Sequence, residues 1–211
     1  MVRDLAYFVQ NDHGPGPGVM LLHSFWGLTS SVRNLADALA DRGYTVLAPD
    51  INFGGLPESE QEALDHLGSA SPDHLASLVL SSVELLHEKS TEGPIGLVGF
   101  GMGGSLGLWA SVRLNTKVAA AVSFYGSQQI DFAGSMSSYL IHLAEEDDFL
   151  SDDDAAFMEA TMGLESLPVE VVRYPATKHG FCEPDGDNFD PEAFERAWSK
   201  TLEFLAERLP N

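Results

Sequence analysis

The chain is 211 residues long and 44% hydrophobic, enough for one folded domain with a sizeable core. Acidic residues outnumber basic ones by 32 to 11, which gives a formal net charge of −21. Such a surface repels phosphate backbones and anionic lipids, so we expect neither nucleic acid nor a membrane as a partner.

The composition also argues against several other classes of protein. No apolar run reaches the roughly 18 residues that a membrane-spanning helix needs, and the first residues do not resemble a signal peptide. Cys182 is the sole cysteine, which excludes an internal disulfide and a cysteine-based zinc site. The acidic runs at 145–148 and 152–154 are typical of solvated faces and helix N-termini. We therefore expect a cytoplasmic protein, monomeric or homodimeric, with no cofactor and no metal.

Strand-like and helix-like patterns alternate along the chain. Short continuous apolar runs predict strands buried on both faces, and apolar residues three or four positions apart predict helices. In chain order we expect a strand at 19–22, a helix at 29–42, a strand at 44–48, a helix at 71–89, a strand at 95–100, a helix at 103–114, strands at 118–125 and 138–143, a helix at 152–162, a strand at 169–174 and a helix at 191–209. The segment 52–71 shows no clear pattern.

This alternation predicts repeated strand–helix–strand units and hence a parallel sheet. We expect an α/β fold in a single domain over residues 1–211. The sheet should be mostly parallel, with about seven or eight strands, helices on both faces and no large cap.

The most informative segment is 98–104, Val-Gly-Phe-Gly-Met-Gly-Gly, which joins a predicted buried strand to a predicted helix. Its glycines suit a sharp turn that raises a central nucleophile to the C-terminal edge of the sheet. The central residue here is Gly101, which has no side chain to attack with. Because a glycine cluster alone could equally bind a phosphate, this interpretation depends on residues further along the chain.

Two such residues follow in the order acid, then histidine. Asp147 comes just after a predicted strand, with Asp148 as the fallback, and His179 lies between the last predicted strand and the last helix. A carboxylate can fix the tautomer of a histidine that acts as a general base. The other histidines are interpreted differently: His142 as a core residue, because it lies within a predicted strand, and those on helices as surface residues.

With these motifs in place, the chain resembles the dienelactone hydrolase family over nearly its whole length. The segments that carry the resemblance are residues 23–28, 48–50, 99–104, 124–126, 144–147 and 179–181. The resemblance implies an α/β-hydrolase fold and hydrolysis of lactones or esters through an acyl-enzyme. It places a cysteine or serine nucleophile at the Gly101 position, with Asp147 and His179 completing the triad. It also implies an oxyanion hole formed by the backbone N–H groups of Phe25 and Met102.

Two departures from the family pattern bear on the substrate. Ser24 stands where enzymes that act on dienelactone carry a glutamate, and Glu183 stands near the position of their substrate-binding arginine. We therefore expect a small ester or lactone that is not strongly anionic. The side chains expected to line its pocket are Ser24, Trp26, Phe124 and Phe181. Ser24 and Cys182 are also the alternative nucleophiles, but neither replaces the missing one convincingly.

Three functions are compatible with a glycine at position 101. In the first, the chain is a hydrolase whose glycine was introduced or whose His179 activates water directly. In the second, it is an inactive relative that binds a small hydrophobic ligand or a partner. In the third, it is an isomerase or lyase that uses His179 and Asp147 for proton transfer. Fold alone does not choose among them. We favour the hydrolase, because a pure binding protein has no need of a buried acid–histidine pair.

Overall fold

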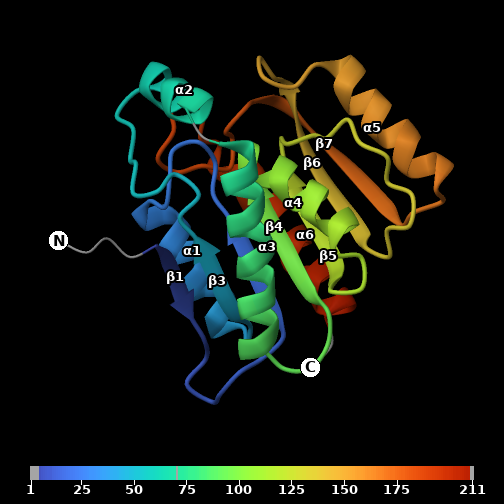
Figure 1. Cartoon of the computed structure of the whole chain (residues 1–211). Helices are drawn as coiled ribbons and strands as arrows, with labels where there is room; N and C mark the ends of the chain where they lie inside the picture. Colours follow the sequence, from blue (N-terminus) through green and yellow to red (C-terminus); the bar gives the residue numbers. More distant parts are fainter. Residues whose placement is uncertain (1–4, 70, 210–211) are drawn as a thin grey trace.

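The computed structural model describes residues 5–69 and 71–209, and this part of the chain forms seven strands and six helices (Figure 1). The strands are β1 (Ala6–Val9), β2 (Gly18–Leu22), β3 (Thr45–Pro49), β4 (Ile95–Phe100), β5 (Val118–Phe124), β6 (Ser138–Glu146) and β7 (Val169–Lys178). The helices are α1 (Ser30–Asp41), α2 (Glu60–Ser69), α3 (Pro72–Lys89), α4 (Met102–Arg113), α5 (Asp152–Leu164) and α6 (Pro191–Arg208).

The strands form one sheet in the order β1-β3-β2-β4-β5-β6-β7. All neighbouring pairs are parallel except β1 with β3, which is antiparallel. Parallel neighbours need crossover connections, and helices supply them except between β5 and β6, where the connecting segment 125–137 contains no helix. The prediction of a mostly parallel sheet flanked by helices is therefore confirmed.

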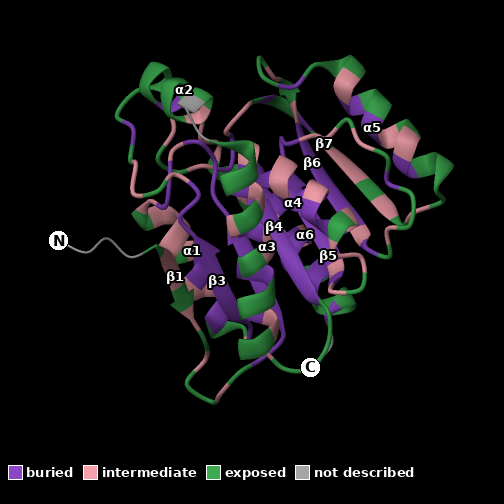
Figure 2. Ribbon diagram, in the orientation of Figure 1, coloured by how far each residue is buried: buried purple, intermediate pink, exposed green. Residues whose placement is uncertain are grey.

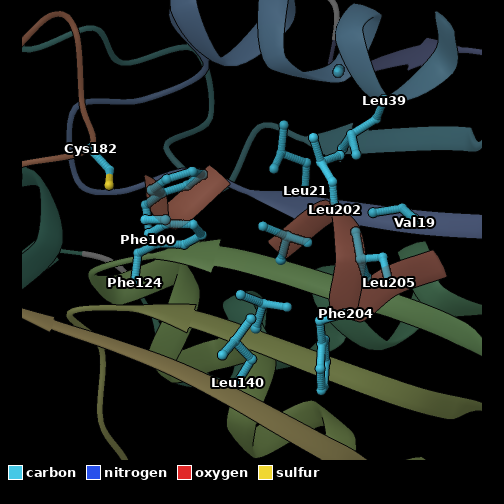
Figure 3. Close-up of a cluster of buried hydrophobic side chains, with 14 of the residues drawn as sticks. Val19, Leu21, Leu39, Phe100, Phe124, Leu140, Cys182, Leu202, Phe204 and Leu205 are labelled. Carbon is cyan, nitrogen blue, oxygen red and sulfur yellow. The ribbon is translucent and has the colours of Figure 1, made fainter. Parts of the chain in front are cut away.

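The helices cover both faces of the sheet. Side chains of α1 and α6, such as Leu39 and Leu202, pack with Val19 and Leu21 of β2 in one core (Figure 3). Met20, between them in the strand, belongs to the second core, with the inner faces of α3, α4 and α5. Successive strand residues thus enter opposite cores, which explains the unbroken apolar run at 19–22. The inner strands β2, β3, β4 and β5 are correspondingly buried, whereas the edge strands β1 and β7 and the outer faces of the helices are more exposed (Figure 2).

Short polar side chains begin three of the helices. Thr29 accepts a hydrogen bond from the Val32 N–H at α1, and Ser151 accepts one from Asp154 at α5. Asp190 caps α6 by accepting from the N–H groups of Glu192 and Ala193. Each cap satisfies backbone donors that have no partner within the helix, which explains where these elements start.

Three elements differ most from the sequence prediction. β1 was not predicted, because its four residues form only a short antiparallel edge. α2 lies in the segment without a pattern, and Ala63 is the only one of its described side chains that is buried, so it has no apolar stripe. β7 continues past residue 174 through Pro175, which an edge strand tolerates because one side of its backbone has no neighbour. No helix in the described ranges has the length and apolar content to cross a membrane.

Candidate active site

The turn after β4 places Gly101 at the C-terminal edge of the sheet, at the N-terminus of α4. Gly101 has φ 50° and ψ −115°, a conformation that residues with a side chain rarely adopt. The helix follows at once and packs tightly, because a Cβ atom on Gly103 would lie 2.3 Å from the carbonyl oxygen of Leu22. The glycines of this segment therefore serve a sharp strand–turn–helix connection, as predicted from the sequence.

His179 and Asp147 meet beside this turn. His179 follows β7, Asp147 follows β6, and these strands are neighbours in the sheet. Nδ1 of His179 lies 2.8 Å from Oδ1 and 2.9 Å from Oδ2 of Asp147. The backbone N–H groups of Phe149 and Leu150 also donate to Oδ1, at 2.9 Å each, and hold the carboxylate in place. Asp147, rather than the fallback Asp148, is thus the partner of His179.

The opposite ring nitrogen of His179 faces the glycine. A Cβ atom built on Gly101 would lie 3.4 Å from Nε2 of His179. Because Nδ1 donates its hydrogen to Asp147, Nε2 carries the free lone pair and can accept a proton from a group in front of Gly101. The geometry brings together the three positions predicted from the sequence.

Aromatic rings hold the imidazole and exclude solvent from it. The ring of Tyr125 lies 4.7 Å from the His179 ring, and the ring of Phe149 lies 4.8 Å from it, measured between centroids. The side chains of His179 and Asp147 are only 10% and 6% exposed. Limited solvent access strengthens the electrostatic interaction within the pair.

Two backbone N–H groups near Gly101 have no partner among the described residues. Met102 is the first residue of α4, so its N–H cannot bond within the helix, and the Phe25 N–H donates to no other group of the described chain. The N-terminus of a helix also carries a partial positive charge. Both groups are therefore free to donate to an oxyanion, as the resemblance implies.

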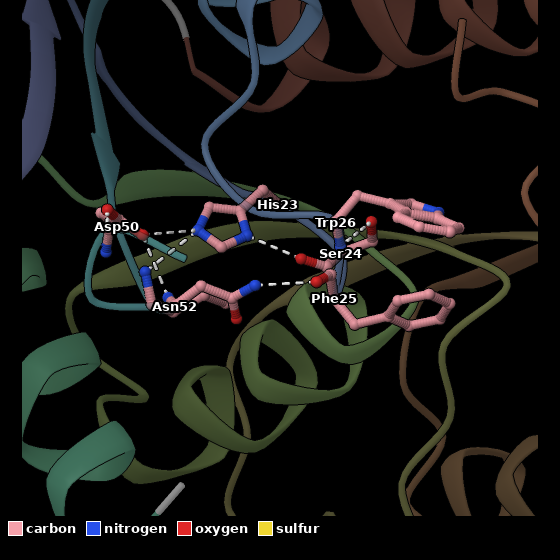
Figure 4. Close-up of polar contacts among 8 residues, drawn as sticks. His23, Ser24, Phe25, Trp26, Asp50 and Asn52 are labelled. Atoms are coloured by element: carbon pink, nitrogen blue, oxygen red, sulfur yellow. Dashed lines mark hydrogen bonds and ion pairs between the residues drawn. The ribbon is translucent and has the colours of Figure 1, made fainter. Parts of the chain in front are cut away.

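Buried polar contacts shape the loop that carries Phe25 (Figure 4). The Ile51 N–H donates to Nε2 of His23 at 3.0 Å, so the ring proton is on Nδ1, which lies 2.7 Å from the Ser24 carbonyl oxygen. Nδ2 of Asn52 donates to the Phe25 carbonyl oxygen at 2.7 Å. These positioning contacts were not predicted, because they join residues about 30 positions apart across two loops.

Glu183 forms a second polar group beside the histidine. Its Oε2 accepts a hydrogen bond from the hydroxyl of Ser24, and its Oε1 accepts one from the hydroxyl of Tyr125 at 3.0 Å. Burial raises the pKa of Glu183, and the two hydrogen bonds and the nearby His179 oppose this rise. Ser24 is thereby engaged in holding Glu183 and the loop, since its oxygen also accepts the Trp26 N–H at 3.3 Å.

A cleft of about 850 Å³ opens above the pair. His179, Glu183 and the aromatic rings of Phe25, Trp26 and Phe149 form part of its wall. The segment 56–60, which includes the start of α2, contributes another part of the wall. This segment was the least legible part of the sequence, so its place at the site could not be predicted.

The structure corrects part of the predicted pocket. Trp26 lines the cleft, but Phe124 and Phe181 are both 0% exposed and belong to the core beneath it. Phe124 lies on β5, where both faces of the sheet are covered, so its ring stacks on Phe100 instead. Ser24, the fourth predicted residue, is only 2% exposed.

Cys182 does not supply a nucleophile at this site. It is fully buried, and burial raises the pKa of its thiol far above the usual range, with Glu183 and Asp190 contributing. A thiol reacts as its thiolate, so this sulfur is unreactive where it lies. Over the described ranges, no three acidic, histidine or cysteine side chains are grouped so as to hold a metal ion.

Comparison with known proteins places the chain in a family. The sequence model described as the dienelactone hydrolase family matches residues 5–209. Protein usf of Aquifex pyrophilus is 28% identical over 206 residues, covering 92% of this chain and 89% of that protein. The carboxymethylenebutenolidase of Pseudomonas sp. strain P51 is 23% identical over 211 residues, covering 93% and 87%.

Solved structures show the same fold. A dienelactone hydrolase-like promiscuous phosphotriesterase from metagenomic libraries superposes with a TM-score of 0.84 at 20% sequence identity, covering 96% of this chain and 92% of that one. At this identity the likeness concerns the α/β-hydrolase fold alone. The fold implied by the resemblance is therefore confirmed.

Proposed function

Since the chain belongs to the dienelactone hydrolase family, we propose that it hydrolyses a small carboxylic ester or lactone by attack of a water molecule that His179 deprotonates. One observation carries this proposal. Nε2 of His179 faces Gly101, Nδ1 is held by Asp147, and the residue between the imidazole and the oxyanion donors has no side chain. A water molecule is small enough to act there as the nucleophile.

The reaction runs in two steps. Nε2 of His179 accepts one proton of the water as its oxygen bonds to the carbonyl carbon, and the carbonyl oxygen becomes an oxyanion. The N–H groups of Phe25 and Met102 donate to that oxyanion, and Asp147 stabilises the imidazolium. The tetrahedral intermediate then collapses, and His179 returns the proton to the leaving alkoxide oxygen. The products are a carboxylic acid and an alcohol, or one hydroxy acid from a lactone.

The lining of the cleft supports a substrate that is not strongly anionic. Among the described residues, the cleft wall contains no lysine or arginine, whereas Glu183 and four further acidic residues belong to it. A volume of about 850 Å³ suits a small organic molecule. A carboxylate-bearing lactone would meet only like charges there.

Hydrolysis of p-nitrophenyl acetate tests the proposal. His179→Ala should lower the rate by roughly 10²–10⁴-fold, the usual contribution of a positioned general base. His13→Ala is the matched control, because this exposed histidine lies outside the cleft. No hydrolysis by the wild type, or a rate that His179→Ala does not change, would favour the ligand-binding alternative.

A further inference from the structure

We propose that the cleft selects esters or lactones that carry an ammonium group, with the carboxylate of Glu183 as the charge partner of that group. The proposal deepens the hydrolytic function above and rests on it. It concerns the substrate class rather than the chemistry of the ester bond.

Glu183 is fixed next to the reacting position. Its carboxylate is held from two sides by the hydroxyl groups of Ser24 and Tyr125. Cβ of Ser24 would lie 3.8 Å from a Cβ atom on Gly101, on the side of the turn that His179 also faces. Glu183 is half-buried and forms part of the cleft wall. A substrate whose carbonyl group reaches Gly101 therefore has Glu183 beside it.

Among the described residues, this carboxylate has no permanent positive partner. The ion pairs among the described residues do not include Glu183, and the cleft wall there has no lysine or arginine. Its two hydrogen-bond donors are neutral hydroxyl groups. Because removing a charge from water is unfavourable unless an opposite charge compensates it, a ligand cation is the group that completes this arrangement.

Aromatic rings in the same cleft as Glu183 suit an ammonium group rather than a simple metal cation. The ring centroids of Phe25 and Trp26 lie 5.0 Å apart, and those of Phe25 and Phe149 lie 5.8 Å apart. All three residues line the cleft. Ring faces attract quaternary and protonated ammonium groups and also bury their alkyl substituents. Exposed acids at the rim, such as Glu58 and Asp187, add a field that attracts cations and repels anions.

A pair of substrates of the same shape tests this directly. Acetylcholine and 3,3-dimethylbutyl acetate differ only in a charged nitrogen that replaces a neutral carbon. We expect kcat/KM of the wild type to be higher for acetylcholine by roughly tenfold, the size of one charge-assisted or cation–π contact. The preference should persist in about 1 M NaCl, where the Debye length is only about 3 Å and the field of the whole surface is screened.

The variant Glu183→Gln keeps the size of the side chain and removes its charge. It should lower the ratio of the two kcat/KM values several-fold, because only the attraction of the aromatic rings for the ammonium group would remain. Glu92→Gln makes the same change of net charge at an exposed position outside the cleft and should keep the wild-type ratio. A wild-type ratio near one would overturn the proposal. So would an equal loss on both substrates in Glu183→Gln, because Glu183 would then act through His179 instead of the substrate.

Binding to the wild type gives a second measurement that needs neither turnover nor a variant. Calorimetric titration should show that choline binds at least several-fold more tightly than 3,3-dimethylbutan-1-ol, its neutral analogue. Equal affinities would overturn the inference. If choline is preferred but neither ester is hydrolysed, the cation site stands and the proposed hydrolytic function fails, so the two failures are distinguishable.

Discussion

A Cβ atom on Gly101 would point at Nε2 of His179 from a distance of 3.4 Å. This is the geometry in which a histidine activates a serine or cysteine, and the rest of the pair, Asp147 included, is present. Gly101 keeps the positive φ of such a turn without carrying the reactive group. The triad therefore lacks only its nucleophilic side chain. The room for that side chain in front of Gly101 and the histidine that would activate it are both present.

Gly101→Ser tests whether this is the nucleophile position. The new side chain should meet no clash, but its backbone would be held at φ 50°, which costs about 1–3 kcal/mol of folding free energy. The hydroxyl should also form an acyl-enzyme with p-nitrophenyl acetate, visible by mass spectrometry. Chemical denaturation and intact mass together check both parts.

Two controls separate strain from chemistry in that experiment. Gly101→Ala should lose the same stability but form no acyl-enzyme, and Gly101→Ser combined with His179→Ala should remain unacylated. If Gly101→Ser is as stable as the wild type, the turn is not under the backbone constraint described here. If it is destabilised and stays unacylated, His179 does not activate this position.

The tight packing of α4 leads to a second prediction about two glycines of one helix. A Cβ atom on Gly103 would lie 2.3 Å from backbone oxygen, whereas one on Gly107 would make ordinary contacts of 3.7 Å and 3.8 Å with Leu22 and Leu97. Gly103→Ala should therefore cost about 3 kcal/mol or more. Gly107→Ala should be neutral or stabilise by up to about 1 kcal/mol, because alanine favours the helix. Similar melting curves for the two variants would contradict the account of this turn.

The net charge of −21 predicts a salt-dependent stability. Repulsion between surface carboxylates opposes folding, and ions screen it, with a Debye length that falls to about 3 Å near 1 M salt. The melting temperature should therefore rise between dilute buffer and about 1 M NaCl. A melting temperature that does not change over this range would show that the surface charge has no net effect on folding.

The burial of His142 leads us to predict that the fold loses stability in acid. It is a core residue, as expected from its place in a strand, with its ring nitrogens 2.9 Å from the Tyr174 hydroxyl and 3.0 Å from Oγ1 of Thr201. Burial, with a contribution from Lys200, lowers its pKa to about 3. Below about pH 6.5 the unfolded chain gains a proton at this residue and the folded chain does not, so the free energy of unfolding falls as the pH drops towards 3.

Comparing two histidine variants isolates this contribution from that of the carboxylates. The free energy of unfolding should depend less on pH between about 4.5 and 7 in His142→Gln than in the wild type. His13→Gln changes an exposed histidine and should keep the wild-type slope. Equal slopes in all three proteins would show that the pKa of His142 is not lowered in the folded state, which would contradict this account.

The sequence predicts some features of this molecule because they follow from chain direction. Parallel strands end at one edge of a sheet, so residues that follow β4, β6 and β7 meet there, and the positions of Gly101, Asp147 and His179 after these strands predict that the three lie close together. Chain direction does not predict contacts between loops in the same way. The hydrogen bond between Ser24 and Glu183 joins residues 159 positions apart, and neither side chain lies on a periodic element.

The sequence also does not show which aromatic side chains near the motifs face the cleft and which face the core. Phe124 and Phe181 are apolar residues near the motifs, as Phe25 and Trp26 are, but the first two point into the core and the latter two into the cleft. Only the direction of each side chain separates these cases. The wall formed by residues 56–60 depends on a loop and a helix without an apolar stripe, which periodicity does not detect.

The central claim, direct attack by water, is tested most directly by mixing the wild-type protein with p-nitrophenyl acetate and following two signals at once. We predict steady release of p-nitrophenol without an initial burst, an unmodified intact mass throughout, and loss of the reaction in His179→Ala. A burst equal to the enzyme concentration, together with an acetylated protein that turns over, would show a covalent intermediate on a side chain and would contradict the claim.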